Sequence, residues 1–199
     1  MGKTHTADEL HARLIGSFVA DPEELGFALT RLTPPKLRTD DVQDHPLWRP
    51  FVLDALSGLA RRFPGLILVP MTLTNPKYHR ETIGGLRVAG IQVEHVSLLA
   101  PPEVVRQRLR SKGSRPQAWD AHRLTGCLEA LSTPQFAQQS HTAGLSVPEV
   151  AEAVAEHAGL GLAPRRGRWH ATWAQVGANM RHIRRQKRPS AITSKGCAA

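Results

Sequence analysis

The sequence predicts an α/β fold built on a parallel sheet, and three observations support this prediction. Short apolar runs typical of strands alternate with segments of helical periodicity along most of the chain. The run 66–72 is continuously apolar, as in strands that are buried on both faces. The chain has 199 residues, 41% of them hydrophobic and 22% charged, which is an ordinary composition for one globular domain.

The chain opens on the triplet Gly2-Lys3-Thr4, followed directly by a helical run to Leu14. In the phosphate-binding loop G-x-x-x-x-G-K-[ST], the last Gly leaves the backbone amides clear, the Lys reaches the β- and γ-phosphates, and the hydroxyl holds Mg²⁺. Only the last third of that motif is present. The triplet alone favours an ordinary chain start that runs into a helix, so the rest of the chain must decide.

A short β-favouring run at 16–20 ends at Asp21-Pro22, where Pro22 fits the first turn of a helix. Asp21 has two interpretations. The commoner one is a helix N-cap. The functional one is a carboxylate at the carboxyl end of a strand, beside a phosphate loop, that accepts a proton from a substrate hydroxyl.

Apolar residues then recur at helical spacing and predict an amphipathic core helix; they are Leu47, Trp48, Phe51, Val52, Ala55, Leu56, Leu59 and Phe63. We assign Trp48 to the core. Arg49 lies near the open end of the sheet and suits either an anionic or sugar-bearing ligand or a salt bridge, two interpretations of equal weight.

After the strand at 66–72, a helix from Asn75-Pro76 to Gly90, a strand at 91–99 and a helix from Pro101 are expected. The last helix and the loop after it are basic. Arg108 and Lys112 share a helix face, and with Arg115 they could fold over the phosphates of a nucleotide. The alternative is a solvated basic face, which the absence of neighbouring acidic residues weakens.

A helix at 119–131 with Cys127 inward, a short polar strand near 140–142 and a helix capped by Ser146 and Glu149 complete the expected domain, residues 1–163. Cys127 and Cys197 have no metal-site spacing and are expected to be free thiols. The ten histidines lack ligand spacing, so we interpret them as structural or surface residues.

The net charge of +9 belongs to the C-terminal part, because the nine basic residues from Arg165 onward have no acidic residue among them and the rest of the chain is neutral. Residues 164–188 form an expected basic amphipathic helix, and 189–199 an expected disordered tail. The helix suits an anionic membrane surface and internal docking equally, ahead of a calmodulin-like or nucleic-acid partner. No apolar run spans a bilayer or signals export, so we expect a cytoplasmic protein, peripheral at the membrane and without specific nucleic acid.

Five segments together resemble the tunicamycin resistance protein family, whose members are ATP-binding P-loop proteins: 21–29 (DPEELGFAL), 46–49 (PLWR), 68–72 (LVPMT), 108–110 (RLR) and 127–132 (CLEALS). The resemblance extends from Gly2 to about Ile183. It implies a P-loop NTPase, nucleotide-kinase-like three-layer fold, resistance to that nucleoside antibiotic, and a membrane-associated C-terminal helix.

By position, the resemblance implies that Gly2, Lys3 and Thr4 bind ATP, with Thr4 on Mg²⁺, and that Arg108, Lys112 and Arg115 belong to the lid. Asp21 and Lys3 are then the expected catalytic residues. The expected substrate contacts are Asp21, Phe27, Trp48, Arg49 and Met71. Against the family, the first strand and the glycine-rich half of the loop are absent, so we expect a start codon assigned too late, by on the order of ten residues.

The leading hypothesis is therefore an ATP-dependent protein that sequesters or phosphorylates tunicamycin. A kinase for another small molecule or nucleotide is the first alternative, because the fold does not fix the acceptor. A non-enzymatic, membrane-attached binding protein is the second.

Overall fold

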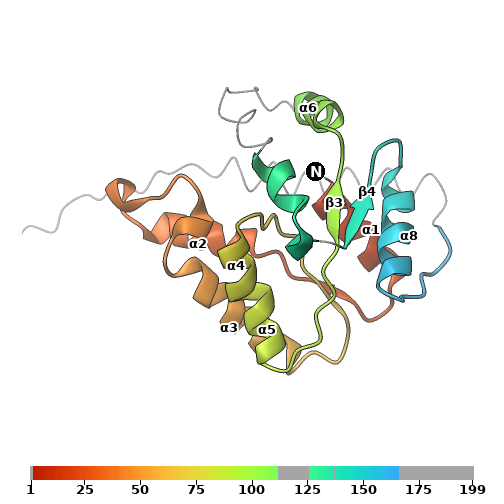
Figure 1. Cartoon of the computed structure of the whole chain (residues 1–199). Helices are drawn as coiled ribbons and strands as arrows, with labels where there is room; N and C mark the ends of the chain where they lie inside the picture. Colours follow the sequence, from red (N-terminus) through yellow and green to blue (C-terminus); the bar gives the residue numbers. More distant parts are fainter. Residues whose placement is uncertain (1, 112–125, 137, 166–199) are drawn as a thin grey trace, which may run out of the picture.

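The computed structural model describes residues 2–111, 126–136 and 138–165, in which helices and strands alternate as the sequence predicts (Figure 1). The helices are α1 (Lys3–Arg13), α2 (Glu23–Leu32), α3 (Trp48–Ala60), α4 (Pro76–His79), α5 (Gly85–Val88), α6 (Pro102–Ser111) and α8 (Val147–His157). The strands are β1 (Phe18–Val19), β2 (Ile67–Leu68), β3 (Ser97–Leu99) and β4 (Gln139–His141). This arrangement confirms the α/β class.

The strands form two parallel pairs. β1 pairs with β2, with Phe18 opposite Ile67, and β3 pairs with β4, with Ser97 opposite Gln139. Parallel pairing is as predicted, but we expected one sheet, and within the described residues no ladder joins β2 to β3. The expected strands 66–72 and 91–99 are also shorter, with two and three ladder residues. In the described part of the chain, β2 pairs with β1 along one edge only, and the ladder ends at Val19 opposite Leu68.

Successive side chains of β2 and the residue after it point to opposite faces, as the pleat of a strand requires. Leu68 packs against a cluster of Leu10, Ala151 and Ala155, which belong to α1 and α8. Val69 packs against a second cluster around α3. Helices therefore cover both faces of the β1–β2 pair, which is the layered arrangement expected for an α/β fold.

The second cluster has α3 at its centre. Trp48, Val52 and Leu56 are four residues apart on one helix face and are buried against Leu29 of α2 and Leu86 of α5. Two other members of the expected apolar stripe face outward: Leu47 and Phe51 are 48% and 44% exposed. They lie one position before Trp48 and Val52, on a side of the helix that neither α2 nor α5 covers.

The expected helix from Pro76 onward contains a turn that the sequence does not reveal. Between α4 and α5, residues Arg80–Gly84 (η3) form a π-helix. A π turn shifts the backbone ladder by one residue and leaves a carbonyl without its usual N–H partner. Within this segment, the hydroxyl of Thr82 donates to the carbonyl of Tyr78, four residues earlier. Gly90 ends the segment with a φ of 79°, as predicted.

The helices α1 and α8 pack side by side (Figure 1). Thr6, Ala7 and Leu10 lie on the buried face of α1, and Ala151 and Ala155 of α8 are 0% and 1% exposed. Small side chains at these positions let the two backbones approach closely. The predicted capping box of α8 is present, with Ser146 and Glu149 bonded reciprocally.

The C-terminal predictions lie largely outside the described residues. Residues 166–199, and with them the expected amphipathic helix, the tail and Cys197, are not described. Within the described ranges, none of the helices is both long and apolar enough to cross a bilayer.

Candidate functional site

The candidate site lies where the chain leaves β1. The amide of Ala20 still donates to the carbonyl of Leu68 at 2.9 Å, and Asp21 follows directly. The carboxylate Oδ1 of Asp21 accepts a hydrogen bond from the amide of Glu23 at 3.0 Å. Asp21 thus forms an Asx turn directly before α2, whose N-cap is Pro22, one residue later than predicted.

Lys3, the first residue of α1, reaches this turn. Its ammonium Nζ lies 2.6 Å from Oε1 of Glu23, so Lys3 and Asp21 are brought together through Glu23. The side chains of Lys3 and Glu23 are 25% and 42% exposed, which leaves the pair open to solvent. The sequence analysis did not single out Glu23. Its position in the first helical turn after Asp21, at the same end of β1, is the signal that could have found it.

The start of α1 has the properties of an anion site. Gly2 has a φ of 125°, and an added Cβ there would meet nothing within 4 Å. As N-cap, Gly2 gives the helix no side-chain hydrogen bond. Amides of a first helical turn, together with the positive end of the helix dipole and an ammonium group, attract phosphate oxygens. Lys3 and the half-buried Thr4 are the first two residues of α1.

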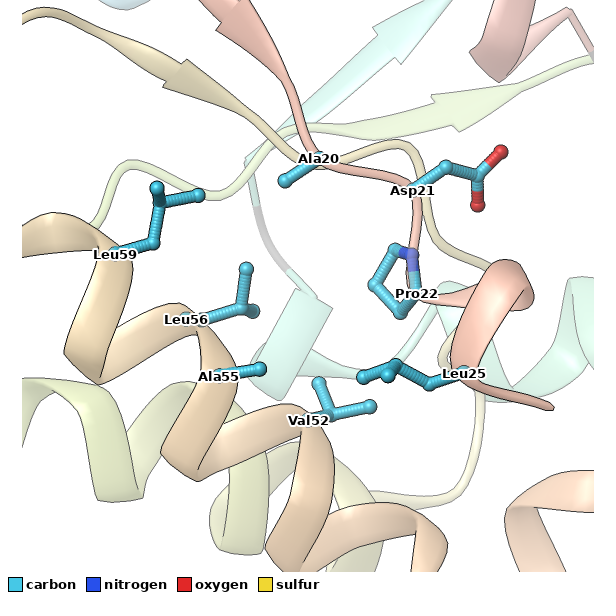
Figure 2. Close-up of a pocket in the computed structure, with 8 residues that line it drawn as sticks. All are labelled: Ala20, Asp21, Pro22, Leu25, Val52, Ala55, Leu56 and Leu59. Atoms are coloured by element: carbon cyan, nitrogen blue, oxygen red, sulfur yellow. The ribbon is translucent and has the colours of Figure 1, made fainter. Parts of the chain in front are cut away.

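An apolar pocket adjoins Asp21 (Figure 2). It has a volume of about 170 Å³ and lies between the end of β1, the start of α2 and one face of α3. Its lining residues are Ala20, Asp21, Pro22, Leu25, Val52, Ala55, Leu56 and Leu59. Figure 2 shows that the carboxylate of Asp21 projects away from the apolar side chains of the pocket. The carboxylate thus marks the rim of the pocket and not its floor.

Arg49 is held within the protein. It forms an ion pair with Glu81 of the π turn and donates to the carbonyl of Gln43. Its guanidinium carbon lies 4.1 Å from the centre of the Tyr78 ring, in a cation–π arrangement. Tyr78 in turn donates to Oδ1 of Asp44 at 2.7 Å, a bond that raises the pKa of Tyr78. Of the two interpretations of Arg49, this geometry shows the salt-bridged one.

The other expected substrate contacts belong to the body of the protein. Trp48 is 2% exposed and forms part of the core, as the sequence analysis assigned it. Its indole nitrogen has no hydrogen-bond partner among the residues that the structure describes. Phe27 is half-buried on α2, and Met71 packs against the α3 cluster. Trp48 and Met71 belong to the same cluster as Val52 and Leu56, which line the pocket beside Asp21.

The expected lid is only partly covered by the described residues. Arg108 lies on α6, which starts at Pro102, one residue after the predicted start at Pro101. Lys112 and Arg115 lie outside the described residues. Their role over a nucleotide stays a prediction.

Two histidines that seemed scattered in the sequence contact each other. The Nε2 of His79 lies 3.4 Å from Nδ1 of His95. The side-chain amide of Gln135 donates to the carbonyl of Pro76 and to Nδ1 of His79, both at 3.0 Å. His79 therefore accepts at Nδ1, carries its proton at Nε2 and donates it to His95. Phe136, 0% exposed, packs edge-on against His79.

Both imidazoles are held neutral. Burial, followed by the neighbouring His79 and Arg87, lowers the pKa of His95 to about 4. Burial, followed by Arg87 and Arg80, lowers the pKa of His79. The pair secures the segment around Phe136 against α4. The described residues contain no group of three or more His, Cys, Asp or Glu side chains that could hold a metal ion.

Comparison with known proteins identifies a relative. Family models and curated proteins give no match. Among solved structures, the chain is similar to the tunicamycin resistance protein of Deinococcus radiodurans, with 41% sequence identity and a TM-score of 0.71. The match covers 81% of this chain and 93% of that chain. Identity of this level over most of both chains shows that this protein belongs to the tunicamycin resistance protein family.

Proposed function

We propose that this protein confers resistance to tunicamycin by transferring a phosphoryl group from ATP to a hydroxyl of the antibiotic. The resistance role is supported by the 41% identity to a tunicamycin resistance protein. The observation that carries the chemistry is the meeting of Lys3 with the turn of Asp21 at the carboxyl end of β1. In α/β sheets, ligands bind outside this end of the strands.

The residues present suit a nucleotide phosphate. Lys3 and the first-turn amides of α1 would bind the phosphates, and the hydroxyl of Thr4 would hold Mg²⁺. Mg²⁺, when bound, would neutralise charge on the phosphate oxygens. Arg108 of α6 is a proposed lid cation, and Lys112 and Arg115, which lie outside the described residues, are the other two.

Asp21 is the proposed proton acceptor. Its Oδ1 is occupied by the amide of Glu23, which orients the carboxylate toward the open side of the site, away from the pocket (Figure 2). A carboxylate oriented in this way can remove a proton from a substrate hydroxyl. The adjoining pocket of about 170 Å³ has an apolar lining and suits a hydrocarbon part of the acceptor.

Product analysis tests the proposal. The protein is incubated with Mg-ATP and tunicamycin, and the antibiotic that stays bound is separated from free antibiotic. All antibiotic is then recovered under denaturing conditions, and its mass is measured by mass spectrometry. An ATP-dependent gain of one phosphate supports the proposal. Stoichiometric, ATP-dependent retention of antibiotic with unchanged mass would replace phosphorylation by sequestration, and neither retention nor modification would overturn the antibiotic role.

A further inference from the structure

The ion pair between Lys3 and Glu23 occupies the ammonium group that the proposed function assigns to a phosphate. The two charged groups are 2.6 Å apart, and Lys3 can bind a phosphate oxygen in full only if it turns away from Glu23. The bond from the amide of Glu23 to Asp21, at 3.0 Å, fixes the backbone of Glu23, so the carboxylate stays within one side-chain length of this turn whichever rotamer it adopts. A phosphate on Lys3 would therefore have the released carboxylate as a close neighbour.

We propose that Glu23 is the resident counter-ion of Lys3 and that it makes the loop selective for polyphosphates whose charge a divalent cation already neutralises. This inference rests on the proposed function. Before binding, Glu23 competes with the phosphate for the ammonium. After binding, it repels the phosphate oxygens, and the repulsion is strongest for a triphosphate without metal.

Glu23 acts through Lys3 and is thus a positioning and selectivity residue. Because the pair is partly exposed, each effect is moderate. We expect E23Q to tighten the binding of inorganic triphosphate without metal by about fivefold, and the binding of Mg-ATP by less than about twofold. A salt bridge with a merely structural role predicts lower stability in E23Q and no change in this ratio of affinities.

The test is calorimetric titration of the protein with inorganic triphosphate in a metal chelator, and with Mg-ATP, at low salt. The variants are E23Q, E23D and K3A. The matched control is E24Q, which removes the same charge one residue further along α2. E23D shortens the side chain but keeps its charge, so it should tighten triphosphate binding less than E23Q does. The effect of E23Q should disappear in the K3A background, because Glu23 acts through Lys3.

Selective tightening in E23Q, absent in E24Q, supports the inference. Equal triphosphate affinities in wild type, E23Q and E23D overturn it and leave the proposed function intact. Binding of neither triphosphate nor Mg-ATP by any of these proteins overturns both. Selective tightening in a protein that leaves tunicamycin unmodified overturns phosphorylation alone.

Discussion

Arg13 and Glu152 are 139 residues apart in the sequence, yet Nη1 of Arg13 donates to Oε1 of Glu152 at 3.0 Å. The same guanidinium donates through Nε to the carbonyl of Ala163 at 2.8 Å, and Arg13 is only 6% exposed. Glu152 also pairs with the more exposed Arg165. One buried arginine thus joins the helix that carries Lys3 to α8 and to the chain beyond it.

Replacing Arg13 by Met keeps much of the side-chain volume but leaves the carbonyl of Ala163 without this donor. We expect a loss of about 2 kcal/mol in the free energy of unfolding, measured by urea denaturation. R165Q is the control. The Arg165 side chain is 52% exposed, so the loss of stability should be clearly smaller than in R13M. Equal losses in R13M and R165Q would show that the burial of Arg13 does not increase the stability of the protein.

Asp21→Asn tests the proposed proton acceptor. The Oδ1 of Asn can still accept from the amide of Glu23, so the turn and the fold should be kept. We expect turnover of tunicamycin to fall by at least about a hundredfold, because general-base catalysis contributes on that order, while the Kd of Mg-ATP stays nearly constant. Rate measurements together with calorimetry check this. Parallel loss of ATP binding and turnover would contradict the assigned role.

Two glycines should respond to the same substitution with opposite signs. A Cβ on Gly65 would lie 1.8 Å from the carbonyl oxygen of Gly16, whereas a Cβ on Gly84 in the π turn would meet nothing within 4 Å. G65A should destabilise the protein by several kcal/mol, about 3 or more, because backbone must move. G84A should stabilise it by about 0.5 kcal/mol, because Ala favours helices. Thermal unfolding of both variants measures the contrast.

The histidine pair predicts a loss of stability in mild acid. The pKa of His95 falls from 6.5 in the unfolded chain to about 4 in the folded protein. Between pH 6.5 and about 4, His95 is protonated in the unfolded chain but neutral in the folded protein. The stability that is present above pH 6.5 is therefore lost as the pH falls toward 4. The lowered pKa of His79 acts in the same direction. Because His95 is partly exposed, we expect a loss of about 1 kcal/mol between about pH 7 and 5.

Denaturation at several pH values, with wild type, H95F and the surface variant H157Q, tests this pH dependence. The free energy of unfolding should depend less steeply on pH in H95F than in the wild type. In H157Q its pH dependence should match that of the wild type. Hydrogen bonds from Arg165 and then from Arg13 lower the pKa of Glu152 from 4.5 to about 2. Protonation of Glu152 therefore causes a further loss of stability below pH 4.5. The denaturation measurements should stay above that pH, so that the effect of His95 is seen alone. A slope unchanged in H95F would remove His95 as its source.

Local patterns in the sequence predicted most of the elements. The capping box of α8, the turn at Gly90 and the helix starts at Pro76 and Pro102 are all determined by residues close in the chain. Strand lengths were overestimated because an apolar run shows burial, whereas a strand ends where its ladder partner ends. The π turn at Arg80–Gly84 could not be predicted, because the hydrophobic spacing is the same with or without it.

The site was predicted only in part, because only some of its residues belong to local sequence patterns. Lys3 and Asp21 belong to local patterns, a loop motif and a helix start, and in the structure both are bonded to Glu23. The contact of Glu23 with Lys3 and the contact of His79 with His95 join residues that are distant in the sequence, so local patterns do not predict them. Arg49 could not be decided from the sequence, because its partner Glu81 lies 32 residues away.

The packing of α1 against α8 has a consequence for synthesis of the chain. Contacts between residues 3–13 and 147–157 close a loop that includes nearly all the other described elements. As the ribosome makes the protein, the apolar face of α1 leaves the exit tunnel long before α8 exists, and it must wait uncovered or be held by a chaperone. Of the described helices, α1 is the earliest made, and it gains its partner only when the last of them is complete.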